Sequence, residues 1–175
     1  MASPRNNGNA RGFRYTEFPE VDPQIQRLLR EAQQKLDSPY NPNSGFSVAA
    51  AVLTSDGQIV VGTNIENAAY GSSICAERTA LSTAHNLGVG DQCVAIAIVA
   101  RGKEGHPTPG VTAPCGECRQ VISEYGWRSG VGEGFRVYLA TTDLQRVLPT
   151  TIGILLPLAF GPEDLLNVEP QEAAN

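Results

Sequence analysis

Three cysteines in two short motifs constrain this chain more than any other feature. Cys75 opens Cys-Ala-Glu-Arg, and Cys115 and Cys118 stand in Pro-Cys-Gly-Glu-Cys. Residues three apart lie on one face of a helix, so a helix opened by Pro114 would direct both thiols of the second motif toward one metal ion. The positive end of the helix dipole also favours the thiolate form that binds metals. The pattern predicts one zinc ion held by three sulfurs.

The number of ligands and one carboxylate favour a catalytic zinc site. A structural site normally has four protein ligands, whereas a catalytic site keeps its fourth position for water. No fourth Cys or His lies near either motif in the sequence. Glu77 lies two positions after Cys75, so on a helix it points to a different side and is poorly placed to bind the same ion. It is well placed to move protons between water and a leaving group, an arrangement known from nucleobase deaminases.

Arg78 is predicted to offset the charge of the thiolates. Zinc with three thiolates carries a formal charge of about −1, which weakens its ability to acidify water unless charge is withdrawn from the sulfurs. Two other interpretations of the cysteines stay open. The missing fourth ligand disfavours a structural zinc site, and the lack of a thioredoxin-like pattern disfavours a redox pair of Cys115 and Cys118. Cys93 is expected to be an ordinary buried thiol.

Length and charge limit the classes of substrate and partner. A chain of 175 residues is long enough for one α/β domain with a real core. A formal net charge of −5 argues against a phosphate-binding surface, so we expect no nucleic-acid partner. Cysteines in metal spacing fit a reducing compartment. With no leader peptide and no apolar run of transmembrane length, we expect a soluble cytoplasmic protein with no membrane partner.

Periodicity and turn residues predict one domain over residues 16–168, with a disordered tail at 1–15 and a polar tail at 169–175. Asp22 and Pro23 begin the clearest helix, and Pro149 places the last strand at a sheet edge. The expected architecture is a mixed five-stranded sheet with helices on both faces. Its expected elements are a helix from 23 to 36, a hairpin of strands 46–54 and 58–65 joined by a turn at Ser55-Asp56-Gly57, a helix over 75–87, a strand over 94–100, a helix over 114–126, and strands over 135–140 and 146–150.

Four motifs follow one another between Ile25 and Leu165. They are Asn64-Ile65-Glu66-Asn67-Ala68, Cys75-Ala76-Glu77-Arg78-Thr79-Ala80, Pro114-Cys115-Gly116-Glu117-Cys118-Arg119-Gln120-Val121, and Leu155-Leu156-Pro157 with Phe160-Gly161-Pro162-Glu163-Asp164-Leu165. Together they resemble the small zinc-dependent cytidine deaminases of pyrimidine salvage. The resemblance implies a three-layer α/β/α sandwich of the cytidine deaminase type, one zinc per chain, and a homotetramer with shared active sites. It also implies hydrolysis of cytidine and deoxycytidine to uridine and deoxyuridine with release of ammonia.

The resemblance also assigns substrate contacts. Two residues would hold the ribose 3′-hydroxyl, namely Asn64 and Glu66. The residues assigned to the rest of the nucleoside are Phe46, Tyr70, Phe160 from a neighbouring chain, and the backbones of Ala76 and Cys115. An independent argument supports the sugar end, because residues two apart on a strand share a face, and a carboxylate accepts from a free hydroxyl but repels a phosphate. Two positions depart from the family pattern: Asn43 replaces the usual Tyr, and Ala49 replaces the usual Gly.

The predicted mechanism has zinc-activated water attacking C4 of cytosine. Glu77 takes the proton of the water, passes it to N3, and then protonates the departing amine. One alternative is a related deaminase of aminonucleoside antibiotics of the blasticidin type, which shares both zinc motifs. A second alternative, from another class, is a catalytically silent zinc-binding interaction protein. The presence of Glu77 and of the sugar-site residues favours the enzyme.

Overall fold

The structure is a computed structural model that describes residues 13–166. The predicted tails at 1–15 and 169–175 therefore lie outside the described residues, except for residues 13–15. Of these, Phe13 and Tyr15 are partly buried against the apolar core. The strands and α-helices are, in order, β1 (Thr16–Glu17), α1 (Pro23–Gln34), β2 (Ser47–Thr54), β3 (Ile59–Thr63), α2 (Ala76–Asn86), β4 (Cys93–Arg101), α3 (Gly116–Arg128), β5 (Arg136–Ala140), β6 (Arg146–Thr151), α4 (Ile152–Leu155) and α5 (Pro162–Leu166).

Helix α1 begins where its capping residues predict. The Asp22 carboxylate accepts a hydrogen bond from the Gln24 backbone N–H at 2.8 Å, and Pro23 occupies the first helical position. Both features stabilise a helix start, because the first backbone N–H groups have no partner within the helix. The apolar positions at helical spacing are buried against the sheet. The prediction of this helix is confirmed.

The sheet has six strands, in the order β1-β6-β5-β4-β2-β3, so the prediction of five strands is wrong. The additional strand is β1, which pairs antiparallel with β6 through Thr16 opposite Val147 and Glu17 opposite Arg146. Two residues are too few to show the alternation that identifies a strand in a sequence. The prediction that Pro149 places the last strand, β6, at a sheet edge is therefore also wrong, because β6 lies between β1 and β5. The β2–β3 hairpin is confirmed. Strand β4 is parallel to β5 and antiparallel to β2, so the sheet is mixed as predicted.

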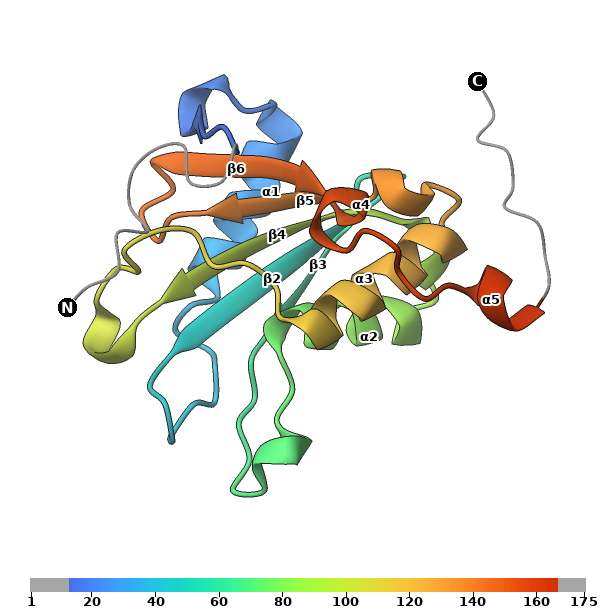
Figure 1. The fold of residues 1–175 in the computed structure, drawn as a ribbon. Helices are drawn as coiled ribbons and strands as arrows, with labels where there is room; N and C mark the ends of the chain where they lie inside the picture. Colours follow the sequence, from blue (N-terminus) through green and yellow to red (C-terminus); the bar gives the residue numbers. More distant parts are fainter. Residues whose placement is uncertain (1–12, 167–175) are drawn as a thin grey trace.

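Helices cover both faces of this sheet (Figure 1). Along β2, Ala49, Ala51 and Leu53 pack in the cluster that contains α1, whereas Ala50 and Val52 pack in the cluster that contains α2 and α3. Burial on both faces explains why β2 and β4 read as continuous apolar runs rather than as alternating patterns. Within residues 13–166, no helix has the length and apolarity that crossing a membrane requires.

Candidate metal centre and substrate cleft

The N-termini of α2 and α3 bring the three metal-site cysteines together. Cys75 is the N-cap of α2, and Cys115 is the N-cap of α3 with its sulfur 3.5 Å from the backbone N–H of Cys118. Pro114 therefore does not open α3, contrary to prediction, because Cys115 has an extended backbone (φ −67°, ψ 172°) and takes the capping position itself. The helix also continues past the predicted end at Gly126, to Arg128.

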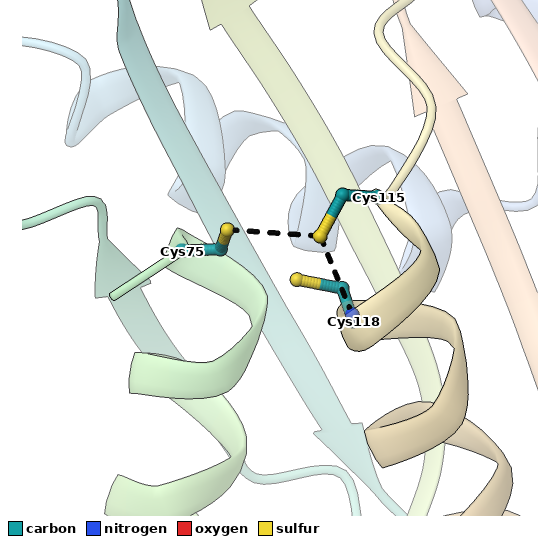
Figure 2. Close-up of side chains that lie close together, drawn as sticks. All are labelled: Cys75, Cys115 and Cys118. Atoms are coloured by element: carbon teal, nitrogen blue, oxygen red, sulfur yellow. Dashed lines mark hydrogen bonds between the residues drawn. The ribbon is translucent and has the colours of Figure 1, made fainter. Parts of the chain in front are cut away.

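The three sulfurs have the spacing of a zinc site. All of them lie within 4.8 Å of one another, and the Sγ atoms of Cys75 and Cys115 are 3.9 Å apart (Figure 2). A tetrahedral ion with Zn–S bonds of about 2.3 Å separates its sulfurs by about 3.8 Å. Figure 2 shows the side chains of Cys75, Cys115 and Cys118 pointing toward one another from the two helix ends. The donor set and its geometry fit zinc.

The surroundings of the sulfurs favour a thiolate at Cys75. A hydrogen bond with the Cys118 thiol is the main influence that lowers the pKa of Cys75 to about 7, and the nearby charge of Arg78 lowers it further. The same interaction with Cys75, together with burial, raises the pKa of the Cys118 thiol. One of the two sulfurs thus ionises easily while its neighbour serves as the hydrogen-bond donor. Such a pair is prepared to exchange a proton for a metal ion.

Glu77 lies in the first turn of α2 and lines the cleft beside Cys75 and Cys115. Its side chain is buried, with an exposed fraction of 4% for the residue. Burial is the main influence that raises the pKa of the Glu77 carboxyl, and the charge of Arg78 opposes it. A carboxyl whose pKa moves toward neutrality is suited to accept and return a proton during a reaction.

Arg78 has a different partner from the one the sequence predicts. Its guanidinium forms an ion pair with Glu117, which bridges the first turns of α2 and α3. The charge of Arg78 nevertheless lowers the pKa of Cys75, so the predicted influence on the sulfurs is present alongside the ion pair. Sequence reasoning missed Glu117. Its position between Cys115 and Cys118 in the sequence indicates that it lies near the metal site. That position does not indicate that its partner is Arg78 on α2.

A cleft of about 380 Å³ opens beside the cysteines. Five of the seven residues predicted to contact substrate line it: Phe46, Asn64, Glu66, Ala76 and Cys115. The other two do not. Tyr70 and Phe160 have exposed fractions of 75% and 58%, and neither lines the cleft of its own chain. Sequence reasoning missed several further lining residues, which come from strand β2 and from loops without a chemical motif: Val48 on β2, and Ser44, Ser73, Ile74, Thr112 and Ala113 in loops.

Asn64 fixes the wall of the cleft through its side-chain amide. Its Oδ1 accepts from the Val48 N–H at 2.8 Å, and its Nδ2 donates to the Phe46 carbonyl at 2.9 Å. The amide thus extends the pairing of β2 beyond the end of the hairpin. This holds in place the backbone of Phe46, which lines the cleft.

Glu66 is held by the loop that precedes β2. The backbone N–H groups of Asn43 and Ser44 donate to its Oε2 at 2.8 and 3.2 Å, and the Ser44 hydroxyl donates to its Oε1. The Ser44 hydroxyl is the main cause that lowers the pKa of Glu66. The group that Asn43 offers is its backbone N–H, which any residue except proline would supply. The departure from the family pattern at this position therefore leaves this contact with Glu66 intact.

Three thiols that converge from two helix N-termini, with one buried carboxyl beside them and a cleft next to them, have the features of a zinc-dependent hydrolytic site. Comparison with known proteins narrows this class. The family described as "Cytidine and deoxycytidylate deaminase zinc-binding region" matches residues 22–131. A cytidine deaminase of Halalkalibacterium halodurans is 44% identical over 142 residues, which are 80% of this chain and 96% of that protein.

Other relatives agree. A cytidine deaminase of Mycobacterium tuberculosis is 38% identical over 148 residues, covering 85% of this chain and 96% of that protein. The crystal structure of cytidine deaminase from Burkholderia pseudomallei superposes with a TM-score of 0.67 at 39% identity, covering 77% of this chain and 97% of that one. This chain belongs to the cytidine deaminase family, and zinc is the cofactor that its zinc-binding region takes.

Proposed function

We propose that this protein hydrolyses cytidine and deoxycytidine to uridine and deoxyuridine with release of ammonia, in pyrimidine salvage. One observation carries the proposal: a buried carboxyl, Glu77, lines a cleft of about 380 Å³ together with Cys75 and Cys115, two of the three cysteines whose sulfurs converge. That cleft has the size of a small-molecule site. Family membership supplies the reaction class, since the relatives described above are cytidine deaminases.

The residues of the site have separate roles in the proposed reaction. Cys75, Cys115 and Cys118 would hold zinc, which when bound acidifies water and so supplies the nucleophile for C4 of the base. Glu77 takes one proton of that water and carries it to N3. It then takes the proton of the hydroxyl formed at C4 and gives it to the amine, so that ammonia leaves as the C4 carbonyl forms. The raised pKa of Glu77 suits both directions of transfer. Phe46 and the backbone groups of Ala76 and Cys115 orient the pyrimidine.

The sugar end of the cleft favours a nucleoside. Glu66 has a lowered pKa and is ionised at neutral pH, so it accepts from a free hydroxyl and repels a phosphate at the same place. Hydrogen bonds from Asn43 and Ser44 hold its carboxylate in one position. The blasticidin-type alternative shares the zinc residues but has no specific support from this end of the cleft. Assays of cytidine, deoxycytidine and blasticidin side by side separate the two.

We further propose a cytoplasmic homotetramer with shared sites, in which Tyr70 and Phe160 act on substrate bound to a neighbouring chain. Both side chains are largely exposed and lie outside the cleft of their own chain, which supports this assignment. Leu158 is fully exposed beside Phe160, and so large an apolar surface favours burial by another chain. The three-layer arrangement and the domain limits 16–168 belong to the same proposal. The two apolar clusters on opposite faces of the sheet support the layers.

Replacement of Glu77 tests the catalytic assignment. Glu77→Gln should keep its zinc and its thermal stability but lose roughly 10²- to 10⁴-fold in kcat, the usual contribution of a general acid or base. Glu124→Gln is the matched control, because Glu124 is exposed on α3 away from the cleft. Activity of Glu77→Gln within about threefold of the parent, measured by the absorbance change of cytidine, would refute the role of Glu77.

Mixed oligomers test the shared site. Glu77→Gln and Phe160→Ala are each expected to be impaired. When the two are co-expressed, some sites combine an intact Glu77 with an intact Phe160 from a neighbour, so activity should rise above that of either variant alone. Verified mixed oligomers that show no rise would mean that both residues serve the site of their own chain.

A further inference from the structure

Arg119 connects the metal centre to the end of α4. It follows Cys118 on α3, and its guanidinium donates to two backbone carbonyls, through Nε to Pro114 at 3.0 Å and through an Nη to Leu155 at 2.8 Å. Pro114 is buried and directly precedes Cys115, whereas Leu155 is the last residue of α4. The two N–H groups belong to one rigid planar fork, so moving either carbonyl disturbs the bond to the other.

Gln120, the next residue, holds the segment that follows α4. Its Nε2 donates to the Phe160 carbonyl at 2.7 Å. Within the described part of the chain, this is the one hydrogen bond that ties residues 157–160 to another element. In Figure 1 the segment from α4 passes close to α3 on its way to α5.

Burial does little to hold this segment. Leu158 is fully exposed and adopts a left-handed backbone (φ 57°), a conformation that is unfavourable for a bulky residue. Phe160 is itself more than half exposed. A strained and exposed stretch keeps one shape only where specific bonds fix it. The bonds to Leu155 and Phe160 bracket this stretch, and both come from the first two turns of α3.

We propose that Arg119 and Gln120 form a carbonyl clamp that couples the metal centre to the position of Phe160. The clamp starts on the same turns of α3 that carry Cys115 and Cys118. Zinc that draws these sulfurs together would also fix the turn from which the clamp reaches Leu155 and Phe160. Both clamp residues are positioning residues, since neither lines the cleft. The expected effect on substrate binding rests on the proposed function, in which Phe160 contacts the base. The coupling between the metal centre and the segment does not depend on that function.

Hydrogen exchange of the zinc-loaded oligomer tests the clamp directly. Gln120→Glu keeps the shape of the side chain and removes the donor. The hydrogen-bonded amides at the two ends of the segment, those of Leu156 and Gly161, should then open more often, so exchange of peptides covering residues 156–161 should rise about five- to tenfold, the equilibrium factor of one net hydrogen bond. Its zinc content should not change. The KM for cytidine should rise by more than kcat falls, because placement of a substrate contact is lost while Glu77 stays in place.

Gln33→Glu is the matched control. Gln33 on α1 makes the same kind of bond, from Nε2 to the Thr142 carbonyl at 2.8 Å, on the other face of the sheet. Its loss should change neither the exchange of residues 156–161 nor the KM. Arg119→Lys retains the positive charge but can satisfy only one carbonyl at a time. It should therefore speed both the exchange of the segment and the loss of zinc to a chelator.

Unchanged exchange of residues 156–161 in Gln120→Glu would overturn the clamp, as would equal loosening in Gln33→Glu. The coupling would also be overturned if Arg119→Lys speeded the exchange of the segment but still released zinc at the parental rate. These readouts do not require catalysis. If the parent lacks deaminase activity but Gln120→Glu shows the expected rise in exchange, only the proposed function is refuted. If the parent is active but Gln120→Glu exchanges at the parental rate, only the clamp is refuted.

Discussion

Gly62 on β3 lies under α2, and the helix backbone leaves no room there for a side chain. A Cβ at this position would lie 2.3 Å from the Ala80 backbone nitrogen and 2.8 Å from the Ala80 Cα, whereas ordinary contact begins at 3.4 Å. Gly62→Ala must therefore displace α2 by about 1 Å, because the obstructing atoms are backbone and interiors are close-packed. The same displacement moves Cys75 and Glu77, which stand at the start of α2.

Two effects of different size follow from this displacement. Overpacking should lower the free energy of unfolding by about 1–3 kcal/mol. Misplacement of Glu77 by about 1 Å should lower kcat by roughly 10²-fold, because catalysis depends on a near-attack geometry. Denaturant unfolding measures the first effect, and steady-state deamination of cytidine by zinc-loaded protein measures the second. Both are to be measured at a temperature where the variant is fully folded.

Two other glycines separate misplacement from simple destabilisation. Gly126→Ala also overpacks, since its Cβ would lie 2.5 Å from the Gly132 carbonyl oxygen, but it does so near the end of α3 opposite to the cysteines. It should lose comparable stability and far less activity. Gly134→Ala meets nothing within 4 Å and should change neither. The reasoning is refuted if Gly62→Ala keeps kcat within about threefold of the parent, or if Gly126→Ala loses as much activity as Gly62→Ala.

Three further predictions concern the cysteines and the charge. Cys118→Ala should sharply reduce zinc measured by metal analysis, while Cys93→Ala should retain it; near-stoichiometric zinc in Cys118→Ala would show that the ligand set is wrong. Burial raises the pKa of the Cys93 thiol to about 11, so iodoacetamide at neutral pH should leave it unmodified in the native protein and alkylate it after denaturation, which peptide mass spectrometry distinguishes. Tight binding or deamination of a single-stranded oligonucleotide at physiological salt should be absent, since the net charge is −5 and Glu66 is ionised; either result would contradict the nucleoside assignment.

Local signals were sufficient for much of the fold. The Asp22 cap with Pro23 identified α1, and the Ser55-Asp56-Gly57 turn between apolar runs identified the β2–β3 hairpin, because each signal acts within a few residues. Strand β1 escaped detection because its pairing with β6 joins residues far apart in sequence. The start of α3 was predicted two positions too early, at Pro114 instead of Gly116, because a proline can precede an N-cap as well as open a helix.

The candidate site, like the fold, could be predicted from the sequence only in part. The residues around the cysteines are predictable because their chemistry is written in short motifs. The loop contacts are not, since the hydrogen bonds from Asn43 and Ser44 to Glu66 and the ion pair of Arg78 with Glu117 depend on how distant segments meet. The positions of Tyr70 and Phe160 outside the cleft are likewise a property of tertiary structure.

The capping positions of Cys75 and Cys115 change the account of charge at the metal centre. Three thiolates with zinc carry about −1, and each helix N-terminus supplies roughly half a positive charge. Since α2 and α3 both begin at these cysteines, the two helix ends together can offset about one negative charge. The guanidinium of Arg78 is at the same time engaged by Glu117, so its positive charge is divided between that carboxylate and the sulfurs. The structure therefore favours the paired helix ends as the main source of charge compensation, with Arg78 in a supporting role and as a link between the two helices.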